Sequence, residues 1–318
     1  MSVIPAGTVA YGIQLPIQSQ STMYVAPWET TAGPAELIRV AQAADDAGFL
    51  YVAVCDHVAI PRRLAGAMGT TWYDTVATLG LLAGVTSRTR LMSHIAVLPL
   101  RHPLTSAKAY STLDHLSGGR LIIGVGAGHV AEEFAQLGVD FSHRGRLLDE
   151  AIDALSVALT EEFPSFAGPT WQFDDAGQSP RPVQTPRPPI WVGGSSPAAI
   201  RRAATRGDGW LPQGTPRAKM PEQIAELRAE RGRSRGGEPI DIGVNCEFCY
   251  VGDPAWEVGR GVLTGSPGRV ADSLNEYTAM GVNQLQVRFK ARTCDELCDQ
   301  IRAFGADVAP LLSPPPGP

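Results

Sequence analysis

Two segments of the chain carry side chains that can exchange a proton near neutral pH. Asp56 and His57 are adjacent and directly follow an apolar run, and His129 follows a second apolar run and the turn-forming Gly128. An imidazole titrates near neutral pH, and a neighbouring carboxylate can shift its pKa. We therefore predict that Asp56 and His57 form an acid/base pair, with His129 as the other candidate for proton transfer. The structural alternative is that Asp56 caps a turn and His57 packs in the interior.

A third segment is suited to bind an anion through backbone amides. Gly193-Gly-Ser-Ser-Pro197 follows an apolar run, and a serine in it can cap a helix that the proline opens. The N-terminus of such a helix presents free N–H groups to a phosphate. The alternative for each glycine loop is a tight turn without a ligand. The predicted anion contacts from these loops are Gly193, Gly194, Ser195, Pro197 and Ala198, with a weaker arrangement at Ala127, Gly128 and His129.

Residue types that ligate metals do not form a known metal-binding pattern. The six histidines show neither His-x-His nor His-Glu-x-x-His spacing. Five cysteines are an odd number and few for 318 residues, which opposes a disulfide framework. Cys246 and Cys249 point to opposite faces of a predicted strand, whereas Cys294 and Cys298 lie on a predicted helix. We expect no metal site, and cysteines that pack as small hydrophobic residues.

The elements that must position these residues alternate between short apolar runs and segments of helical period. Eight such units predict an α/β fold, a closed (β/α)8 TIM barrel that residues 1–312 form as a single domain. Residues 313–318 are rich in proline, and we predict a disordered tail there. The predicted strands are Val9–Leu15, Leu50–Cys55, Arg90–Leu98, Arg120–Gly126, Ile190–Gly193, Gly209–Leu211, Ile240–Val251 and Asn283–Val287.

Barrel enzymes place their active sites at the carboxyl ends of the strands. This rule brings the proton-transfer and anion-binding candidates to one end of the predicted barrel. One long segment interrupts the repeat: residues 163–189 contain seven prolines and a strand-like piece at Trp171 to Phe173. We predict an insertion that covers the barrel as a lid. The strand-end rule selects Asp56, His57, His94, Ile95, Gly126 to His129, Gly193 to Ser196, Arg288 and Lys290.

The composition excludes several classes of function. A formal net charge of −5 opposes general binding of nucleic acid, which needs a basic surface. No run approaches the roughly 18 apolar residues that a membrane span requires, and the first residues do not resemble a leader, so we expect a cytoplasmic protein. The apolar segments Tyr73–Val85 and Leu104–Leu116 predict helices that can supply the face of a homodimer. A small-molecule substrate fits these limits.

Several motifs, in a fixed order, carry a resemblance to a known family. They are Ala44-Asp-Asp-Ala-Gly48, Val54-Cys-Asp-His57, Leu98-Pro-Leu-Arg-His-Pro103, Leu113-Asp-His-Leu-Ser-Gly-Gly-Arg-Leu121, Gly124-Val-Gly-Ala-Gly128, Glu132-Glu-Phe134, Pro188-Pro-Ile-Trp-Val-Gly-Gly-Ser195 and Arg206-Gly-Asp-Gly-Trp-Leu-Pro212. Together they resemble the luciferase-like superfamily of flavin-dependent monooxygenases and F420-dependent oxidoreductases. The similarity covers nearly the whole chain.

The resemblance implies where a cofactor binds. A deazaflavin or flavin ring is expected across the barrel mouth over the third strand, with its phosphate tail at Gly193 and Gly194 and with Asp56 and His57 beside the ring. Members of the superfamily commonly have a non-proline cis peptide bond in that strand, which by position is His94–Ile95. His129 stands where related glucose-6-phosphate dehydrogenases have a catalytic glutamate, so that substrate is not implied.

The resemblance also implies a redox function. We expect hydride transfer between the deazaflavin F420 and a small organic substrate, with His57 or His129 handling the proton. One alternative is an FMN-dependent two-component monooxygenase that uses O2 and receives reduced flavin from a separate reductase. The other is a flavin-binding protein without turnover. The same glycine loops can hold either cofactor, and the substrate and the direction of transfer stay open.

Overall fold

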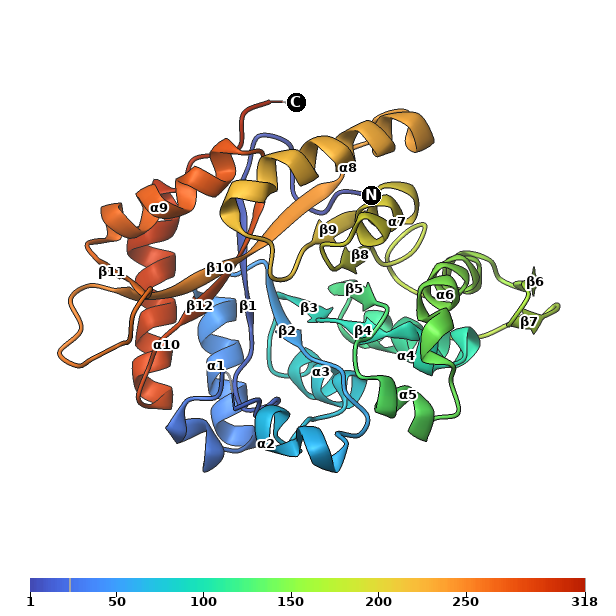
Figure 1. The fold of residues 1–318 in the computed structure, drawn as a ribbon, viewed down its shortest axis with the longest axis horizontal. Coiled ribbons are helices and arrows are strands. Elements are labelled where there is room, and N and C mark those ends of the chain that lie inside the picture. Colours follow the sequence, from blue (N-terminus) through green and yellow to red (C-terminus); the bar gives the residue numbers. More distant parts are fainter. Residues whose placement is uncertain (23, 318) are drawn as a thin grey trace.

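Eight strands, paired in parallel, close into a barrel in the computed structural model, which describes residues 1–22 and 24–317 (Figure 1). Pairing of β12 with β1 and of β9 with β10 completes the ring, so the predicted (β/α)8 TIM barrel is confirmed. The barrel strands, in order around the ring, are β1 (Ala10–Gln14), β2 (Tyr51–Val54), β3 (Arg90–Ser93), β5 (Leu121–Gly126), β8 (Ile190–Gly193), β9 (Gly209–Leu211), β10 (Asp241–Val251) and β12 (Gln284–Phe289).

Two short strands extend this ring. The predicted third strand is interrupted after Ser93, and its continuation, β4 (Ala96–Val97), pairs with β5. The long β10 has an irregular register between Asn245 and Phe248, and its end pairs with β11 (Leu263–Gly265). Strand β10 therefore projects beyond the ring at its carboxyl end.

Helices surround the barrel on the outside (Figure 1). Several begin where the sequence predicts: the side chain of Ser266 accepts a hydrogen bond from the amide of Arg269 at 3.4 Å. The helix predicted from Tyr73 begins at Thr75, because Asp74 caps it through the amide of Ala77 at 2.8 Å. The α-helices are α1 (Pro34–Asp46), α2 (Ala65–Met68), α3 (Thr75–Ala83), α4 (Pro103–Leu116), α5 (Ala131–Gln136), α6 (Arg144–Thr160), α7 (Pro197–Arg206), α8 (Met220–Arg235), α9 (Pro267–Ala279) and α10 (Cys294–Ala303).

Shorter helical turns lie in the connections. The 3-10 turns are Pro27–Thr30, Arg62–Leu64, Leu98–Leu100, Phe141–His143, Arg217–Lys219 and Ala309–Leu311, and Phe304–Val308 forms a π-helical turn.

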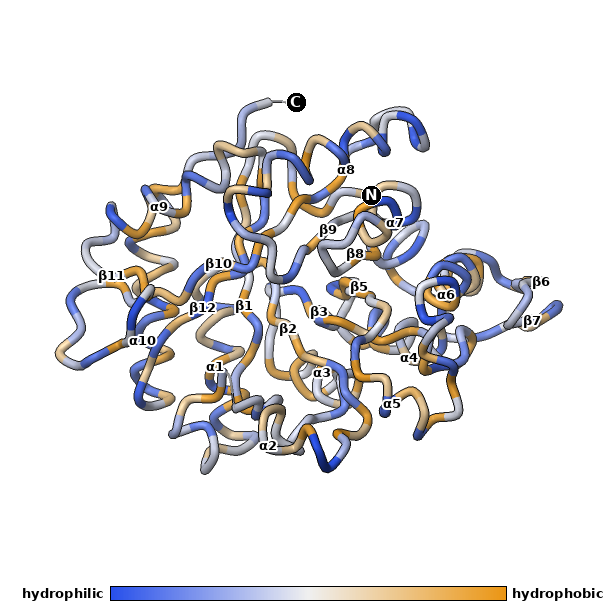
Figure 2. The backbone as a smooth tube through the Cα atoms, viewed as in Figure 1, coloured by the Kyte–Doolittle hydropathy of each residue, from blue (hydrophilic) through white to orange (hydrophobic). Residues whose placement is uncertain are grey.

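The main hydrophobic core lies between the strands and the helices, and a second, smaller cluster fills the barrel itself. Figure 2 shows hydrophobic residues along central strands such as β2 and β5, whereas the far end of α8 is hydrophilic. Inside the barrel the ring of Tyr51 contacts Trp191 edge to face, with 5.9 Å between centroids. A Cβ atom at Gly12 would lie 2.5 Å from the Tyr51 ring, so only glycine fits there. The barrel is thus a packed core and not a pore.

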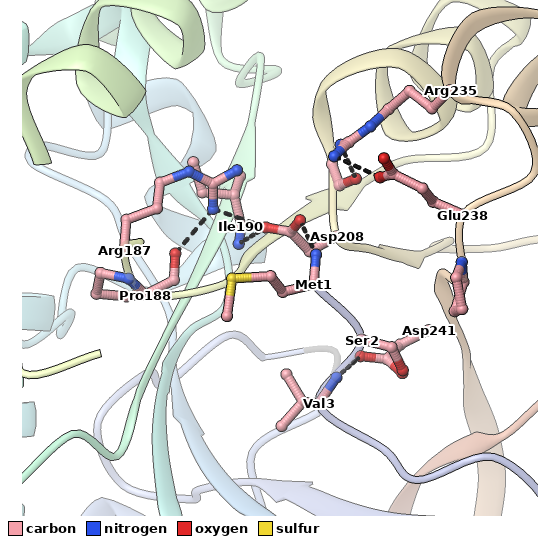
Figure 3. A network of polar contacts seen from close by, with 12 residues as sticks. Met1, Ser2, Val3, Arg187, Pro188, Ile190, Asp208, Arg235, Glu238 and Asp241 are labelled. Carbon is pink, nitrogen blue, oxygen red and sulfur yellow. Dashed lines mark hydrogen bonds and ion pairs between the residues drawn. The ribbon is translucent and has the colours of Figure 1, made fainter. Parts of the chain in front are cut away.

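Carboxylates at the amino end of the barrel are held by the chain itself (Figure 3). Asp208 lies 2.6 Å from the guanidinium of Arg187 and accepts the amide of Ile190 at 2.9 Å. Asp241 accepts the amide of Val3 at 2.7 Å. The N-terminal ammonium of Met1 also pairs with Asp208. Together these contacts join the start of the chain to the beginnings of β8, β9 and β10.

The segment of residues 163–189 is an insertion, but the expectation of a lid over the active-site end is wrong. It joins the end of α6 to the start of β8, and such a connection lies at the amino end of the strands, opposite the mouth. Asp114 of α4 accepts the amides of Val183 and Gln184 at 2.8 and 3.0 Å, which fixes the later part of the segment. The earlier part forms a hairpin of β6 (Phe166–Ala167) and β7 (Gln172–Phe173) that projects beside α6 (Figure 1).

Residues 313–317 form neither helix nor strand, and the amide of Ser313 donates to Asn275 at 2.8 Å. Pro318 lies outside the described residues, and the disorder of this tail stays a prediction. Within residues 1–22 and 24–317, no helix is both long enough and apolar enough to cross a membrane.

Candidate active site

The loop after β2 holds a histidine that is paired with a buried carboxylate. His57 Nδ1 lies 3.0 Å from Glu133 Oε2, and the two side chains are 9% and 2% exposed. Glu133 Oε1 accepts the amides of Val58 and Ala59 at 2.6 and 3.1 Å. Burial raises the pKa of Glu133, but these hydrogen bonds outweigh it, so the pKa lies below its usual range. An ionised Glu133 therefore orients the imidazole.

The other nitrogen of His57 is the one available for chemistry. When Nδ1 donates to Glu133, Nε2 is left as an acceptor, and in the described chain it has no hydrogen-bond partner. The ring packs against Trp72, with 4.5 Å between centroids, and against His129 at 5.4 Å. Burial, followed by the nearby His57, lowers the pKa of His129. The two candidate histidines thus meet at the ends of β2 and β5, as the strand-end rule predicts.

Asp56 does not pair with His57, so the predicted acid/base pair needs a correction. Its carboxylate oxygens each lie 2.6 Å from the guanidinium of Arg101, and one accepts the amide of Val97 at 2.8 Å. Adjacent residues at the end of an extended strand point to opposite sides, which separates Asp56 from its neighbour. Asp56 is 6% exposed and ties the end of β2 to the turn after β4. The carboxylate that serves His57 is Glu133.

The peptide bond between His94 and Ile95 is cis, as the resemblance implies. His94 Nδ1 lies 3.2 Å from Gln14 Oε1, while Nε2 is buried and has no partner among the described residues. Burial, followed by the charge of Arg288, lowers the pKa of His94 to about 4, so the ring is neutral at pH 7. The side chain of Ile95 occupies the space that a Cβ atom at Gly193 would need. Only glycine lets the end of β8 approach Ile95 this closely.

The loop from Gly193 to Ala198 has the geometry of an anion site. Gly194 has a φ of +100°, in the region that favours glycine, and Ser196 caps α7 by accepting the amide of Ala199 at 3.2 Å. The amides of Ser195 and Ser196 have no partner within the described chain. These amides precede a helix of ten residues that begins at Pro197, so they can donate to a phosphate together with the helix N-terminus.

The loop at Ala127, Gly128 and His129 is built differently. The helix that follows, α5, has only six residues and begins at Ala131, two positions after His129. A Cβ atom at Gly128 would lie 2.7 Å from both Val97 and Phe134, so tight packing is enough to require the glycine. This loop also places the side chain of His129 beside His57.

A cavity of about 360 Å³ opens at the carboxyl ends of β1, β9, β10 and β12. The predicted catalytic and cofactor residues do not line it. Gln14, which lines the cavity, connects it to His94 through the 3.2 Å contact. Other lining residues are Tyr24, Trp28, Asn245, Phe248, Arg288 and Lys290.

Sequence reasoning missed two parts of the site, namely Glu133 and the aromatic walls of the cavity. Glu133 lies in the motif Glu132-Glu-Phe134, which carried a resemblance but no assigned role. It lies 76 positions from His57, so no local spacing predicts their contact. Arg288 and Lys290 of the same cavity were predicted, because they follow the end of a predicted strand. Among the described residues, no group of three or more metal-ligating side chains is arranged to hold an ion.

Comparison with known proteins connects this geometry to one family. A family model described as luciferase-like monooxygenase matches residues 10–258. An uncharacterized protein of Mycobacterium tuberculosis is 32% identical over 255 residues, which cover 74% of this chain and 89% of that protein. The FMNH2-dependent dimethylsulfone monooxygenase of Pseudomonas putida is 30% identical over 210 residues, which cover 65% of this chain and 56% of that enzyme.

A solved structure shares the fold at low sequence identity. The coenzyme F420-dependent tetrahydromethanopterin reductase of Methanopyrus kandleri superposes with a TM-score of 0.71 and 21% identity, covering 95% of this chain and 99% of that one. The similar proteins therefore include both F420-dependent and FMN-dependent enzymes.

Proposed function

Because this chain belongs to the luciferase-like monooxygenase family, we propose that it is an oxidoreductase that moves a hydride between the deazaflavin F420 and a small organic substrate. The observation that carries the proposal is the pairing of His57 with Glu133 beside the barrel mouth. Hydride transfer to a carbonyl, or from an alcohol, moves a proton as well. A histidine held by an ionised carboxylate is suited to exchange that proton.

Two observations support a fit between the mouth and such a cofactor. The free amides of Ser195 and Ser196 at the start of α7 suit a phosphate. The Nε2 atom of His94, buried and without a partner in residues 1–22 and 24–317, suits a polar edge of a ring. When bound, F420 would supply the hydride acceptor or donor. The residues that would hold it are Gly193, Gly194, Ser195, Pro197 and Ala198 at the phosphate, with His94 and Ile95 at the ring and Ala127 and Gly128 beside it.

The chain's own residues then have separate roles in proton transfer. In the oxidation direction, His57 Nε2 accepts the proton of a substrate hydroxyl, and in reduction it returns one. Glu133 stays ionised and stabilises the imidazolium that forms. His129, whose pKa is lowered, is neutral and can hydrogen-bond the substrate. Asp56 is a positioning residue that fixes the end of β2 through Arg101.

Titration of cofactor-free protein with F420 and with FMN, followed by absorbance and fluorescence, tests the proposal. We expect F420 to bind at least about tenfold more tightly, a difference of about 1.4 kcal/mol. The similarity to a dimethylsulfone monooxygenase favours the two-component FMN enzyme as second candidate. Tighter binding of FMN, with O2 consumed when reduced FMN is supplied, would favour that candidate and exclude ours. Cofactor binding without turnover of any substrate would indicate a flavin-binding protein that is not an enzyme.

We also propose that the enzyme is a homodimer that pairs through α3 and α4. An apolar groove runs between these helices, and Leu81 and Leu116 beside it are 44% and 66% exposed. A second copy of the chain can cover both grooves through one self-complementary contact. Sedimentation at micromolar protein should show a dimer that Leu116→Glu dissociates. A single-chain species in the unmodified protein would exclude the dimer.

A further inference from the structure

Two cations project from the carboxyl end of β12 into the cavity described above. Arg288 and Lys290 are two positions apart, so they lie on the same side of the extended chain. The guanidinium carbon of Arg288 lies 4.5 Å from the centroid of the Phe248 ring, and Lys290 Nζ lies 4.2 Å from the same centroid. Both positive charges are therefore concentrated around one aromatic residue in the cavity wall.

In the part of the chain that the structure describes, neither cation forms an ion pair with a carboxylate within 4.0 Å. Arg288 donates through Nε and one Nη to the carbonyl of Cys246 at 3.0 and 2.9 Å, and Lys290 Nζ has no hydrogen-bond acceptor there. Glu29 faces the same cavity, and its oxygens accept the amides of Ile17 and Ala26 at 2.9 and 2.8 Å. Burial raises the pKa of Glu29 more than these hydrogen bonds and the charge of Lys290 lower it, so this carboxylate offsets the lysine charge only in part. Two like charges without a direct ion pair among the described residues repel each other at a partly closed cavity. A bound anion would remove that repulsion.

The rest of the cavity limits the size and chemistry of the occupant. About 360 Å³ is near the lower end of the range for small-molecule sites, and Tyr24, Trp28 and Phe248 give it aromatic walls. Among the described residues, Asn245 Oδ1 is buried without a partner, while its amide nitrogen is directed to the carbonyl of Pro212 at 3.5 Å. A ligand with an N–H or O–H group would satisfy this oxygen.

We propose that Arg288 and Lys290 bind the carboxylate of the substrate, and that the substrate is a small organic acid with an aromatic or other flat apolar body. This inference rests on the proposed function, because it assigns the cavity to the acidic end of the molecule that exchanges the hydride. His57 lies outside the cavity, which adjoins His94 through Gln14. The anionic tail of the cofactor is assigned elsewhere, to the loop between β8 and α7. An arginine can hold both oxygens of a carboxylate, and a lysine adds a point charge.

The test compares benzoate with benzamide, which has nearly the same shape without the charge. Isothermal titration measures both probes with the unmodified protein, with Lys290→Met and with Arg288→Met. The matched control is Arg233→Met, which removes the same charge from the exposed surface of α8. Lys290→Met is the main variant, because Arg288→Met also removes the hydrogen bonds to Cys246.

We expect benzoate to bind at least about tenfold more tightly than benzamide. Lys290→Met should remove that preference, and Arg233→Met should retain it. Equal affinities for the two probes, no benzoate binding, or an unchanged preference in Lys290→Met would overturn the proposal.

Titration of the same variants with F420 separates this proposal from the proposed function. Unchanged F420 affinity in Lys290→Met supports a substrate site. A loss of F420 affinity as large as the loss for benzoate would assign the cations to the cofactor and overturn the inference. Benzoate preference in a protein that does not bind F420 would support the anion site while excluding the proposed cofactor.

Discussion

The charged and polar groups at the two ends of the barrel differ in whether the chain supplies their hydrogen-bond partners. At the amino end, buried Asp208 and Asp241 are surrounded by donors from the chain, including Arg187 and several amides (Figure 3). At the carboxyl end, the Nε2 atom of His94 and the ammonium of Lys290 have no partner in the described chain. A buried polar group without a partner destabilises the fold, so a ligand is the natural complement. In our proposal the amino end supports stability, and the carboxyl end supports binding and chemistry.

The largest effect should come from the amino end. Asp208→Ala leaves Arg187 without its partner, and the two side chains are only 2% and 12% exposed. Breaking a buried pair costs about 3–5 kcal/mol of unfolding free energy. Chemical denaturation should show this loss, while F420 affinity of the folded protein is retained. Asp299→Ala, which removes an exposed pair with Arg302, is the control and should cost less than about 1 kcal/mol. Equal stability of the two variants would contradict a stabilising role of the amino end.

At the carboxyl end, His57→Asn should reduce activity and not stability. This change should lower hydride transfer by roughly 10²-fold, the usual scale for a positioned proton-transfer group, and leave F420 affinity and stability nearly unchanged. His129→Asn should act mainly on KM. Stopped-flow measurements with the first substrate that is turned over, across a range of pH, will distinguish the two. A rate that is kept in His57→Asn and lost in His129→Asn would reverse the roles.

The pH dependence of stability tests whether the carboxyl end destabilises the fold. The folded pKa of His94 is lowered from 6.5 to about 4, so the unfolded chain binds the proton more readily. Stability is then complete above about pH 6.5 and is lost as the pH falls toward 4, by about 2 kcal/mol at pH 5. His94→Asn cannot bind this proton and should lose less between pH 7 and pH 5. Parallel curves for the two proteins would contradict a buried neutral His94.

The smallest effect concerns the phosphate loop. Gly194→Asp places a negative charge where the amides of Ser195 and Ser196 converge, and F420 affinity should fall by at least tenfold, about 1.4 kcal/mol. Gly194→Ala is the control, because the positive φ strains any side chain there. Aspartate should weaken binding more than alanine does. The same loss in both variants would indicate backbone strain and not repulsion of a phosphate.

The sequence predicts the barrel well because its signals are local. Apolar runs predict all eight barrel strands, and Ser266 with Pro267 predicts the start of α9. The partner of His57 could not be predicted, because strand and loop spacing places Asp56 beside it in sequence while the fold brings Glu133 beside it in space. The contact between His57 and Glu133 depends on tertiary packing of the loops after β2 and β5.

The position of the insertion, residues 163–189, also could not be predicted from local signals. Its proline content predicts an irregular segment, but composition does not say which end of the barrel receives it. Its connection from α6 to β8 determines that, and the connection follows only once the strands are correctly counted.

The hairpin β6–β7 gives this enzyme a convenient attachment point. Glu150 of α6 accepts the amides of Thr170 and Trp171 of the hairpin at 2.7 and 2.9 Å, and the hairpin projects from the side of the barrel (Figure 1). A fluorophore or an affinity tag placed at Pro169, in the turn of the hairpin, would lie away from the mouth where substrate enters. The protein could then be immobilised on a sensor surface in one orientation, attached through its side and not through the mouth of the barrel.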